Sequence, residues 1–349
     1  MNPAITAAAE QIVAQRRAPG LVLAVAHGDA PPEIVAIGED GAGHALTPDS
    51  LFPVASITKL AVALLTLHLA GRGLLALDDD LALYLPHAAA AQPGVTIRSL
   101  LCHTSGLPTD IPPALVPYSA DLTAAALLAA CAETPLETLP QRAVRYSNVA
   151  FGLLALLAEE VGDAPFVPQI QRLVLAPLGV RGYFGEEPPD APAVIADVRG
   201  DHRRTAIEPF NSAHWRGLAL PWAGLITDAA GALRLVMAFA DRSGALIAPT
   251  LRDEATRSQT GDLAGGFVAP LLWDPCPWGL GVEVRGVKLP HWVPLAAGAA
   301  SFGHSGGSGC HGWVSEERGV AWFLHGLRAA DGGWLLRSAP AIGEAVLAG

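Results

Sequence analysis

Hydrophobic and polar positions near the N-terminus predict one helix followed by two strands. Residues 3–18 have the spacing of an amphipathic helix, and the Ala18-Pro19-Gly20 break leads into Leu21 to Ala26, an apolar run of strand length. Ile34 to Ile37 could pair with that run, and residues 39–50 are rich in turn formers. The N-terminal region is therefore expected to contribute two strands to a sheet.

The C-terminal part returns to a strand pattern. Strands are expected over 280–284, 312–315 and 320–325, a tight turn over 316–319, and a closing helix over 333–347. Since the turn is short, the last two strands are expected to form an antiparallel hairpin. We predict that the early and late strands share one sheet in an α/β (α+β) fold.

The middle of the chain is predicted to be helical. Ser56 to Leu69 is the first strongly helical segment and ends at Gly71-Arg72-Gly73. Residues 74–224 then alternate alanine- and leucine-rich helical runs with proline-rich loops. We expect a discontinuous sheet domain formed by residues 1–73 and 225–349, with an inserted helical domain over 74–224.

Composition and charge narrow the class of partner. The chain has 349 residues, of which 51% are hydrophobic and 16% charged, so it can bury a large core. The formal net charge of −11, with scattered arginines, argues against nucleic acid or an anionic membrane as partner. A small-molecule ester or amide is the expected substrate, and the sequence leaves the oligomeric state open.

Targeting and cysteine patterns predict a cytoplasmic protein without a metal or other cofactor. No apolar run is long enough to span a bilayer, and the N-terminus lacks the basic start and cleavage site of a signal peptide. The four cysteines, Cys102, Cys131, Cys276 and Cys310, are widely separated. This spacing favours buried core residues over a disulfide framework or a metal knuckle.

The chemistry is expected to centre on Ser56-Ile57-Thr58-Lys59. Lys59 is one of only two lysines in the chain, and it follows Ser56 by three residues at the start of an apolar helix. Positions i and i+3 lie on one helix face, so the hydroxyl and the amine can meet there. The alternative is an N-cap serine with a solvated lysine.

Two further segments carry scarce or conformationally special residues. Tyr146-Ser147-Asn148 precedes an apolar helical run, and its alternative interpretation is an asparagine turn leading into that helix. The segment Phe302 to Cys310 contains four glycines, which allow another backbone or a ligand to approach a strand edge. Its alternative interpretation is a hairpin kinked by glycine.

The order and context of these segments resemble the serine β-lactamase, penicillin-binding protein and family VIII esterase superfamily. Ser56 to Lys59 is similar to its Ser-x-x-Lys motif, Tyr146 to Asn148 to its Tyr-x-Asn motif, and His304-Ser305-Gly306 to its third motif. Leu100 to Pro108, which reads LLCHTSGLP, resembles another signature of the superfamily, and Leu77-Asp78-Asp79 adds to the match. The tyrosine form places the chain nearer the class C and esterase branch.

This resemblance implies a β-lactamase-like fold, with an antiparallel sheet flanked by helices and an inserted all-helical lobe. It also implies roles for named residues. Ser56 would be the nucleophile, Lys59 its proton acceptor and Tyr146 a second acid/base that protonates the leaving group. Asn148 would orient the substrate carbonyl or a backbone. The oxyanion would be held by the backbone amides of Ser56 and Gly307, with glycine at 307 allowing close approach of the strand.

The third motif narrows the substrate class. His304 stands where many lactamases carry a lysine that holds the substrate carboxylate, with Gly306 and Gly307 completing the substrate-binding edge. The resemblance therefore implies a serine hydrolase, most closely a carboxylesterase on small acyl esters. A D-amino-acid or muropeptide peptidase that uses a protonated His304, a weak β-lactamase and an acyltransferase remain alternatives. A non-enzymatic alternative is an acylated sensor or ligand-binding protein.

Three other patterns lie outside this scheme. Residues 303–307 also match Gly-x-Ser-x-Gly, which would make Ser305 a nucleophile, but no acid and histidine follow in the required order and context. Residues 307–312 match a dinucleotide fingerprint without the helix that it needs. Four tryptophans are expected in loops and turns: Trp215, Trp222, Trp273 and Trp278. Their two alternative roles are to line an acyl pocket and to fill the interface between the lobes.

Overall fold

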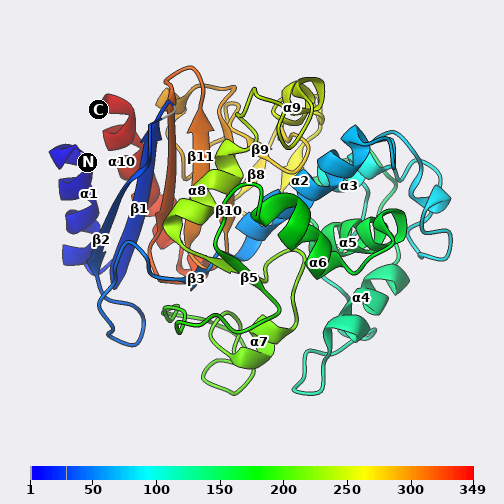
Figure 1. The fold of residues 1–349 in the computed structure, drawn as a ribbon, viewed down its shortest axis with the longest axis horizontal. Helices are drawn as coiled ribbons and strands as arrows, with labels where there is room; N and C mark the ends of the chain where they lie inside the picture. Colours follow the sequence, from blue (N-terminus) through cyan, green and yellow to red (C-terminus); the bar gives the residue numbers. More distant parts are fainter. Residues whose placement is uncertain (1, 29) are drawn as a thin grey trace.

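A computed structural model describes residues 2–28 and 30–349 and places the functional segments around a six-stranded antiparallel sheet (Figure 1). The strands of this sheet, in the order β2-β1-β12-β11-β10-β9, are β2 (Glu33–Gly38), β1 (Gly20–His27), β12 (Val320–His325), β11 (Cys310–Ser315), β10 (Phe302–Gly306) and β9 (Glu283–Val284). The two early strands therefore share one sheet with the late strands, as predicted. The tight turn over 316–319 joins β11 and β12 in an antiparallel hairpin.

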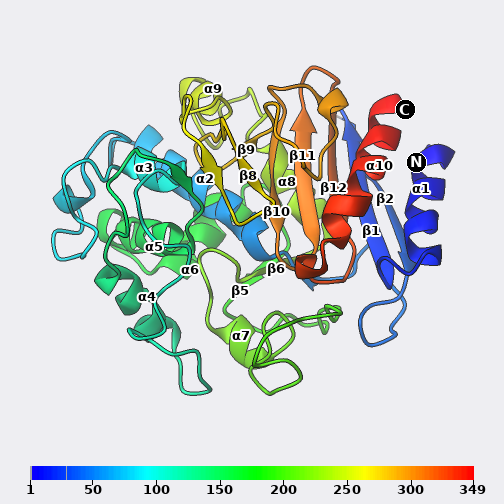
Figure 2. The ribbon, with the colours of Figure 1, turned by 180° about the vertical axis from the view of Figure 1, so that it is seen from behind.

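Helices cover both faces of the sheet. On one face lie α1 (Pro3–Ala14) and α10 (Trp334–Ala348), which pack side by side, and on the other lies α8 (Ala229–Met237), as Figures 1 and 2 show from opposite sides. Strands β11 and β12 are buried at every position. Neither strand has a solvent-exposed face, because helices cover both faces of the sheet.

The remaining helices lie mostly beside the sheet, with α2 in the centre of the molecule. They are α2 (Thr58–Gly71), α3 (Ile97–Leu101), α4 (Ala124–Glu133), α5 (Asn148–Gly162), α6 (Phe166–Ile170), α7 (Ala213–Gly217) and α9 (Pro249–Ala255). Helix α2 packs on α5 and α8 and is buried around nearly its whole circumference. Such a helix belongs in a core, and its N-terminal end carries Lys59.

Short strands and single turns complete the fold. One small sheet contains β3 (Phe52–Pro53), β6 (Leu225–Thr227) and β5 (Gly182–Phe184). A second contains β4 (Val144–Arg145), β7 (Gly265–Gly266) and β8 (Leu272–Trp273). The tight helical turns are η1 (Ala55–Ile57), η2 (Leu81–Leu83), the π-helical η3 (Gln171–Leu175), η4 (Leu295–Ala297) and η5 (Ala330–Gly332). The proposed domain boundaries at 73/74 and 224/225 remain a prediction.

Several expected elements differ in extent. The first helix ends at Ala14, since Arg16 adopts a left-handed φ of 54°. The strand expected over 280–284 is reduced to β9, because Gly281 has a φ of 88° and turns the backbone before Glu283. Ser56 lies in η1, just before α2 begins. Trp215 and Trp273 lie in α7 and β8, so their placement in loops was wrong.

Across the described part of the chain, none of the helices combines the length and the apolar character that crossing a membrane requires.

Candidate active site

The first motif forms a buried contact between an amine and a hydroxyl. Lys59 Nζ lies 3.0 Å from Ser56 Oγ, and the lysine side chain is completely buried. Ala55, just before the serine, has a left-handed φ of 45°, an unusual conformation for a non-glycine residue and one found often at functional sites. The chain thus turns sharply out of β3 and presents the half-buried Ser56 ahead of α2.

The environment of Lys59 favours the neutral amine. Nζ also contacts Asn148 Oδ1 at 2.7 Å and the backbone oxygen of Trp222 at 3.0 Å. Burial lowers the pKa of Lys59 well below its ordinary value, although the negative charge of Asp110 opposes this shift. A lysine with a lowered pKa can accept a proton near neutral pH, so the solvated-lysine alternative does not describe this residue.

The second motif reaches the same place from the junction of β4 and α5. Ser147 is the N-cap of α5: its side chain accepts from the Ala150 N–H, and its hydroxyl donates to the Pro108 oxygen. Tyr146 is buried beside it, with its ring centroid 4.7 Å from Lys59 Nζ and its hydroxyl in hydrogen-bond contact with Ser56. Burial raises the pKa of Tyr146 above its ordinary value, so the phenol stays protonated at neutral pH.

Asn148 is the first residue of α5 and lies beside the lysine. Its amide links Lys59 to Asp110, because Oδ1 accepts from Nζ and Nδ2 donates to Asp110 Oδ1 at 2.6 Å. The resemblance implied that this asparagine orients a substrate carbonyl or a backbone. In the structure it contacts the lysine, and Asp110 is a partner that the sequence analysis did not identify.

His304 is buried in β10 behind the site. Its ring centroid lies 5.9 Å from that of Tyr146 and 5.7 Å from that of Trp278. Nδ1 donates to the Ser305 oxygen at 2.6 Å, so the neutral tautomer leaves Nε2 unprotonated. Burial, with help from the charge of Lys59, lowers the pKa of His304 to about 4. The ring is therefore neutral near pH 7, and the cationic His304 on which the peptidase alternative depends is not available there.

Close approach of β10 to the turn that carries Ser56 depends on Gly306. A Cβ atom added at 306 would lie 2.4 Å from the Val54 oxygen, whereas one added at 307 would meet nothing nearer than Phe210 at 3.7 Å. The prediction that glycine is needed at 307 for close approach was therefore wrong by one residue. Position 307 is exposed and lies just past the end of β10.

Two backbone amides at this junction have unused donors. Within residues 2–28 and 30–349, the N–H groups of Ser56 and Gly307 donate to no acceptor. Both flank the cavity that contains the Ser56 side chain. Two free amides near a hydroxyl are what an oxyanion hole requires.

The cavity at Ser56 has a volume of about 350 Å³ and a largely apolar wall. It is lined by Ser56, Tyr146, Phe267, Val268, Ala269, Pro270, Leu271, Trp292, Ser305, Gly306, Gly307, Ala330, Gly333, Leu335 and Leu336. None of these described residues carries a positive charge. The lining contains Trp292 and none of the four tryptophans Trp215, Trp222, Trp273 and Trp278.

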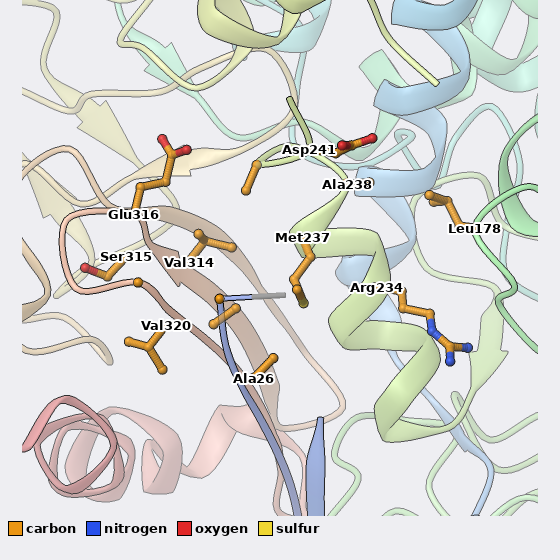
Figure 3. A pocket seen from close by; sticks show the side chains of 14 residues that line it. Ala26, Leu178, Arg234, Met237, Ala238, Asp241, Val314, Ser315, Glu316 and Val320 are labelled. Carbon is orange, nitrogen blue, oxygen red and sulfur yellow. The ribbon is translucent and has the colours of Figure 1, made fainter. Parts of the chain in front are cut away.

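A second cavity, of about 490 Å³, lies elsewhere, between α8 and the ends of β11 and β12 (Figure 3). Its wall includes Met237, Val314, Glu316 and Val320, and Glu316 is already paired with Arg252. None of the residues proposed for the active site lines it. It is therefore separate from the Ser56 site.

The other lysine lies in a buried ion cluster that the sequence analysis did not identify. Lys288 Nζ contacts Glu283 Oε1 at 2.8 Å, and His291 Nε2 lies 3.2 Å from the same oxygen. Burial opposes ionisation of Glu283, but Lys288 and His291 outweigh it and lower the pKa of that carboxyl to about 2. The rarity of lysine in the chain is the signal that could have drawn attention to position 288.

The rejected patterns have structural roles. Ser305 lies within strand β10 and not in the strand-to-helix turn that a nucleophile elbow needs. Residues 307–312 lead into strand β11. The four cysteines are buried and free, as expected. No cluster of histidine, cysteine and acidic side chains suited to a metal ion is found among the described residues.

Comparison with known proteins defines the family. The family model described as Beta-lactamase matches residues 5–326, which is nearly the whole chain. The protein therefore belongs to the Beta-lactamase family, a family of serine hydrolases that share its fold.

Individual relatives include one esterase. The chain is 30% identical over 318 residues to esterase EstB from Burkholderia gladioli, an alignment that covers 77% of this chain and 80% of the relative. It superposes on EstCE1, described as a hydrolase with promiscuous acyltransferase activity, with a TM-score of 0.79, 20% identity and coverage of 99% and 97%. D-amino acid amidase from Ochrobactrum anthropi SV3 gives a TM-score of 0.76, 19% identity and coverage of 99% and 98%. At these identities the two structures show the shared fold alone.

Proposed function

We propose that the protein is a serine carboxylesterase that hydrolyses small, uncharged acyl esters through a covalent acyl-enzyme on Ser56. The observation that carries the proposal is the buried contact of 3.0 Å between Lys59 Nζ and Ser56 Oγ. A serine hydroxyl is a weak nucleophile until an adjacent base removes its proton. A buried lysine with a lowered pKa is such a base.

In the proposed reaction Ser56 Oγ attacks the ester carbonyl carbon while its proton passes to Lys59 Nζ. The tetrahedral oxyanion is held by the amides of Ser56 and Gly307. Collapse breaks the bond to the leaving oxygen, which takes up a proton and departs as an alcohol. Water then attacks the acyl-enzyme by the same route, releasing the acid and restoring the hydroxyl. Each amide donor contributes about 3 to 4 kcal/mol to transition-state stabilisation.

The two candidate acid/base groups differ in the proton state that burial favours. Burial lowers the pKa of Lys59 and raises that of Tyr146, so near neutral pH the amine is the better base and the phenol the better acid. We therefore assign proton abstraction to Lys59 and protonation of the leaving oxygen to Tyr146. The two groups share Ser56 as a neighbour, so their titration is coupled.

The charge of the site favours uncharged esters over substrates that carry a carboxylate. The pKa of His304 is lowered to about 4, and the described cavity lining has no cationic side chain. A lactam acid or a peptide C-terminus would lose its hydration without gaining a counter-charge. The apolar wall is suited to a small acyl group, and similarity to esterase EstB supports this choice.

The test is turnover of nitrophenyl acetate and nitrophenyl butyrate by the wild type, Ser56→Ala and Ser305→Ala. We expect steady turnover that Ser56→Ala abolishes and that Ser305→Ala retains. Labelling with a fluorophosphonate, followed by peptide mapping, is expected to modify residue 56. Modification at residue 305 would overturn the assignment of the nucleophile.

The same preparation separates the alternatives. A single equivalent of nitrophenol without further release would identify an acylated sensor. Faster hydrolysis of D-amino amides or of a chromogenic cephalosporin than of the butyrate ester would favour the peptidase or β-lactamase alternative. Ester formation with an added alcohol, in excess over hydrolysis, would favour an acyltransferase.

A further inference from the structure

A row of three hydrogen bonds connects a surface carboxylate to the serine. The exposed Asp110 accepts from Asn148 Nδ2 at 2.6 Å, Asn148 Oδ1 accepts from Lys59 Nζ at 2.7 Å, and Nζ lies 3.0 Å from Ser56 Oγ. Asp110 lies outside every motif that carries the family resemblance. The contacts nevertheless place it only one residue away from the catalytic lysine.

The carboxylate determines which way the Asn148 amide faces. An ionised carboxylate can only accept hydrogen bonds, so the atom that faces Asp110 is the amide nitrogen. The amide oxygen is then the atom that faces Lys59. Without Asp110, rotation of the amide by half a turn would place its NH₂ group against Nζ.

That orientation decides where the lone pair of the lysine points. A neutral amine has two N–H donors and one lone pair. The Asn148 Oδ1 and Trp222 O atoms that contact Nζ can only accept, so together they use both donors. The remaining direction, toward Ser56 Oγ, holds the lone pair. A rotated Asn148 would instead offer an N–H that competes for this lone pair.

We infer that Asp110 is a positioning residue that, through the amide of Asn148, directs the lone pair of Lys59 at the Ser56 hydroxyl. The inference rests on the proposed function only in taking Ser56 and Lys59 as the reacting pair, and it is independent of the substrate. Its position on the surface sets Asp110 apart from the buried groups that fix the rest of the site.

The charge of Asp110 supplies a readout that a purely structural role lacks. The titratable groups that face Lys59 are Asp110, Tyr146, His103 and His304. Burial keeps the two histidines neutral and the tyrosine protonated near pH 7, so among the described residues Asp110 supplies the charge that acts on Lys59. That charge raises the pKa of Lys59 against the effect of burial. Removal of the charge should therefore move the acidic limb of the activity profile to lower pH.

The experiment compares Asp110→Asn, Asp110→Ala and the control Asp121→Asn, an exposed carboxylate later in the same loop. The rate of Ser56 labelling by a fluorophosphonate is measured against pH, together with kcat/KM for nitrophenyl butyrate. We expect both Asp110 variants to lose about tenfold in plateau labelling rate, as misoriented catalytic groups do, and to shift the acidic limb downward. Asp121→Asn should change neither.

Exchange of the two side chains tests the orientation itself. Asn148→Asp alone should move the acidic limb to higher pH, because a carboxylate then contacts Lys59. In the double variant Asp110→Asn/Asn148→Asp, the amide introduced at position 110 can donate to the new carboxylate, so the plateau rate should recover relative to Asn148→Asp. The inference would be overturned if Asp110→Asn kept the acidic limb of its pH profile at the wild-type position and was labelled at a rate within about twofold of the wild type.

The labelling assay also keeps the two proposals distinct. A wild type that is labelled at Ser56 but turns over no ester would contradict the proposed esterase function and leave the Asp110 test intact. Unfolding midpoints in urea should be alike for the wild type and the two Asp110 variants, since Asp110 is exposed. If Asp110→Asn and Asp110→Ala both lose stability while the acidic limb of their pH profiles stays at the wild-type position, the role of Asp110 is structural and the inference fails.

Discussion

The ring of His103 packs on the ring of Tyr146, with the centroids 4.6 Å apart, and His103 also holds the backbone on both sides of that tyrosine. Its backbone oxygen accepts from the Arg145 N–H at 2.8 Å, and its Nδ1 accepts from the Ser147 N–H at 3.1 Å. His103 is completely buried and has a left-handed φ of 61°. The tyrosine is therefore fixed by a residue from a different sequence motif.

Replacement of His103 should separate this positioning role from simple packing. In His103→Asn the amide oxygen can still accept from Ser147, and asparagine tolerates the left-handed conformation. His103→Ala leaves a buried N–H without an acceptor, at a cost of about 1 to 3 kcal/mol. We expect kcat for nitrophenyl butyrate to fall on the order of 100-fold in His103→Ala with little change in KM, and much less in His103→Asn. Equal losses in the two variants would contradict this role.

The two lysines should respond to the same substitution in opposite ways. Lys59→Met removes the proposed base, so kcat/KM should fall on the order of 10²- to 10⁴-fold while the fold persists. Lys288→Met leaves the buried Glu283 carboxylate without its closest cation, which should lower the free energy of unfolding by about 3 to 5 kcal/mol. Esterase assays and urea unfolding of both variants give the comparison. A stable Lys288→Met protein would count against the ion cluster as described.

Tyr146→Phe should discriminate between leaving groups. Nitrophenolate is a stable leaving group, whereas an alkoxide must be protonated as it departs. If Tyr146 supplies that proton, the variant should lose more kcat/KM on an alkyl butyrate than on nitrophenyl butyrate, by a factor of about 10 or more. Parallel hydrolysis of the two esters by the variant and the wild type measures this ratio. An unchanged ratio would assign the proton to another donor.

The two glycines after His304 should tolerate alanine differently. A methyl group at 306 would lie 2.4 Å from the Val54 oxygen and 2.6 Å from Cys310 Sγ, so Gly306→Ala must push β10 away from the Ser56 turn. Overpacking of this kind costs about 1 to 3 kcal/mol. At 307 the methyl group has room. We expect Gly306→Ala to lower both the urea midpoint and kcat, and Gly307→Ala to leave the midpoint near that of the wild type.

Acid should destabilise the protein over a defined window. Burial lowers the pKa values of His304 and His325 to about 4 and that of His311 to about 3. Below about pH 6.5 the unfolded chain binds protons that these folded imidazoles do not bind. The free energy of unfolding should therefore fall from about pH 6.5 toward pH 4, by roughly 1.4 kcal/mol per pH unit for each histidine.

Urea unfolding at about pH 7.5, 6 and 5 measures that slope. His311→Gln is the matched variant. In the wild type, His311 Nε2 accepts a hydrogen bond from the Trp322 side-chain N–H at 2.9 Å. Glutamine removes the titrating ring but keeps an acceptor for that N–H. Its slope should be smaller than that of the wild type. A stability that stays constant or rises on acidification would contradict the lowered pKa values.

Much of the fold could be predicted from the sequence because it depends on patterns of neighbouring residues. The turn at 316–319 joins two apolar runs, and the antiparallel hairpin there is as predicted. Gly281 shows where such reasoning fails: a single left-handed glycine shortened an expected strand. Apolar composition alone does not reveal the backbone angles of one residue.

In the candidate site, too, contacts between residues close in sequence were predictable and contacts between distant residues were not. Ser56 and Lys59 are one turn apart in the chain, so their contact could be expected from spacing. Asp110 and His103 reach Asn148 and Ser147 across gaps of 38 and 44 residues, and no periodicity relates such distant positions. The family resemblance pointed to Tyr146 and His304 but gave no sign of how deeply each is buried.

The sequence by itself determined the last hairpin, the pairing of Ser56 with Lys59 and the family to which the chain belongs, because each depends on neighbouring residues or on short motifs. The tertiary structure alone decided that Lys59 is buried, that His304 is neutral, and that Gly306 is the position of close approach. Proton affinities follow from the solvent and charge around a group, and that environment is set by segments from distant parts of the chain once they pack together.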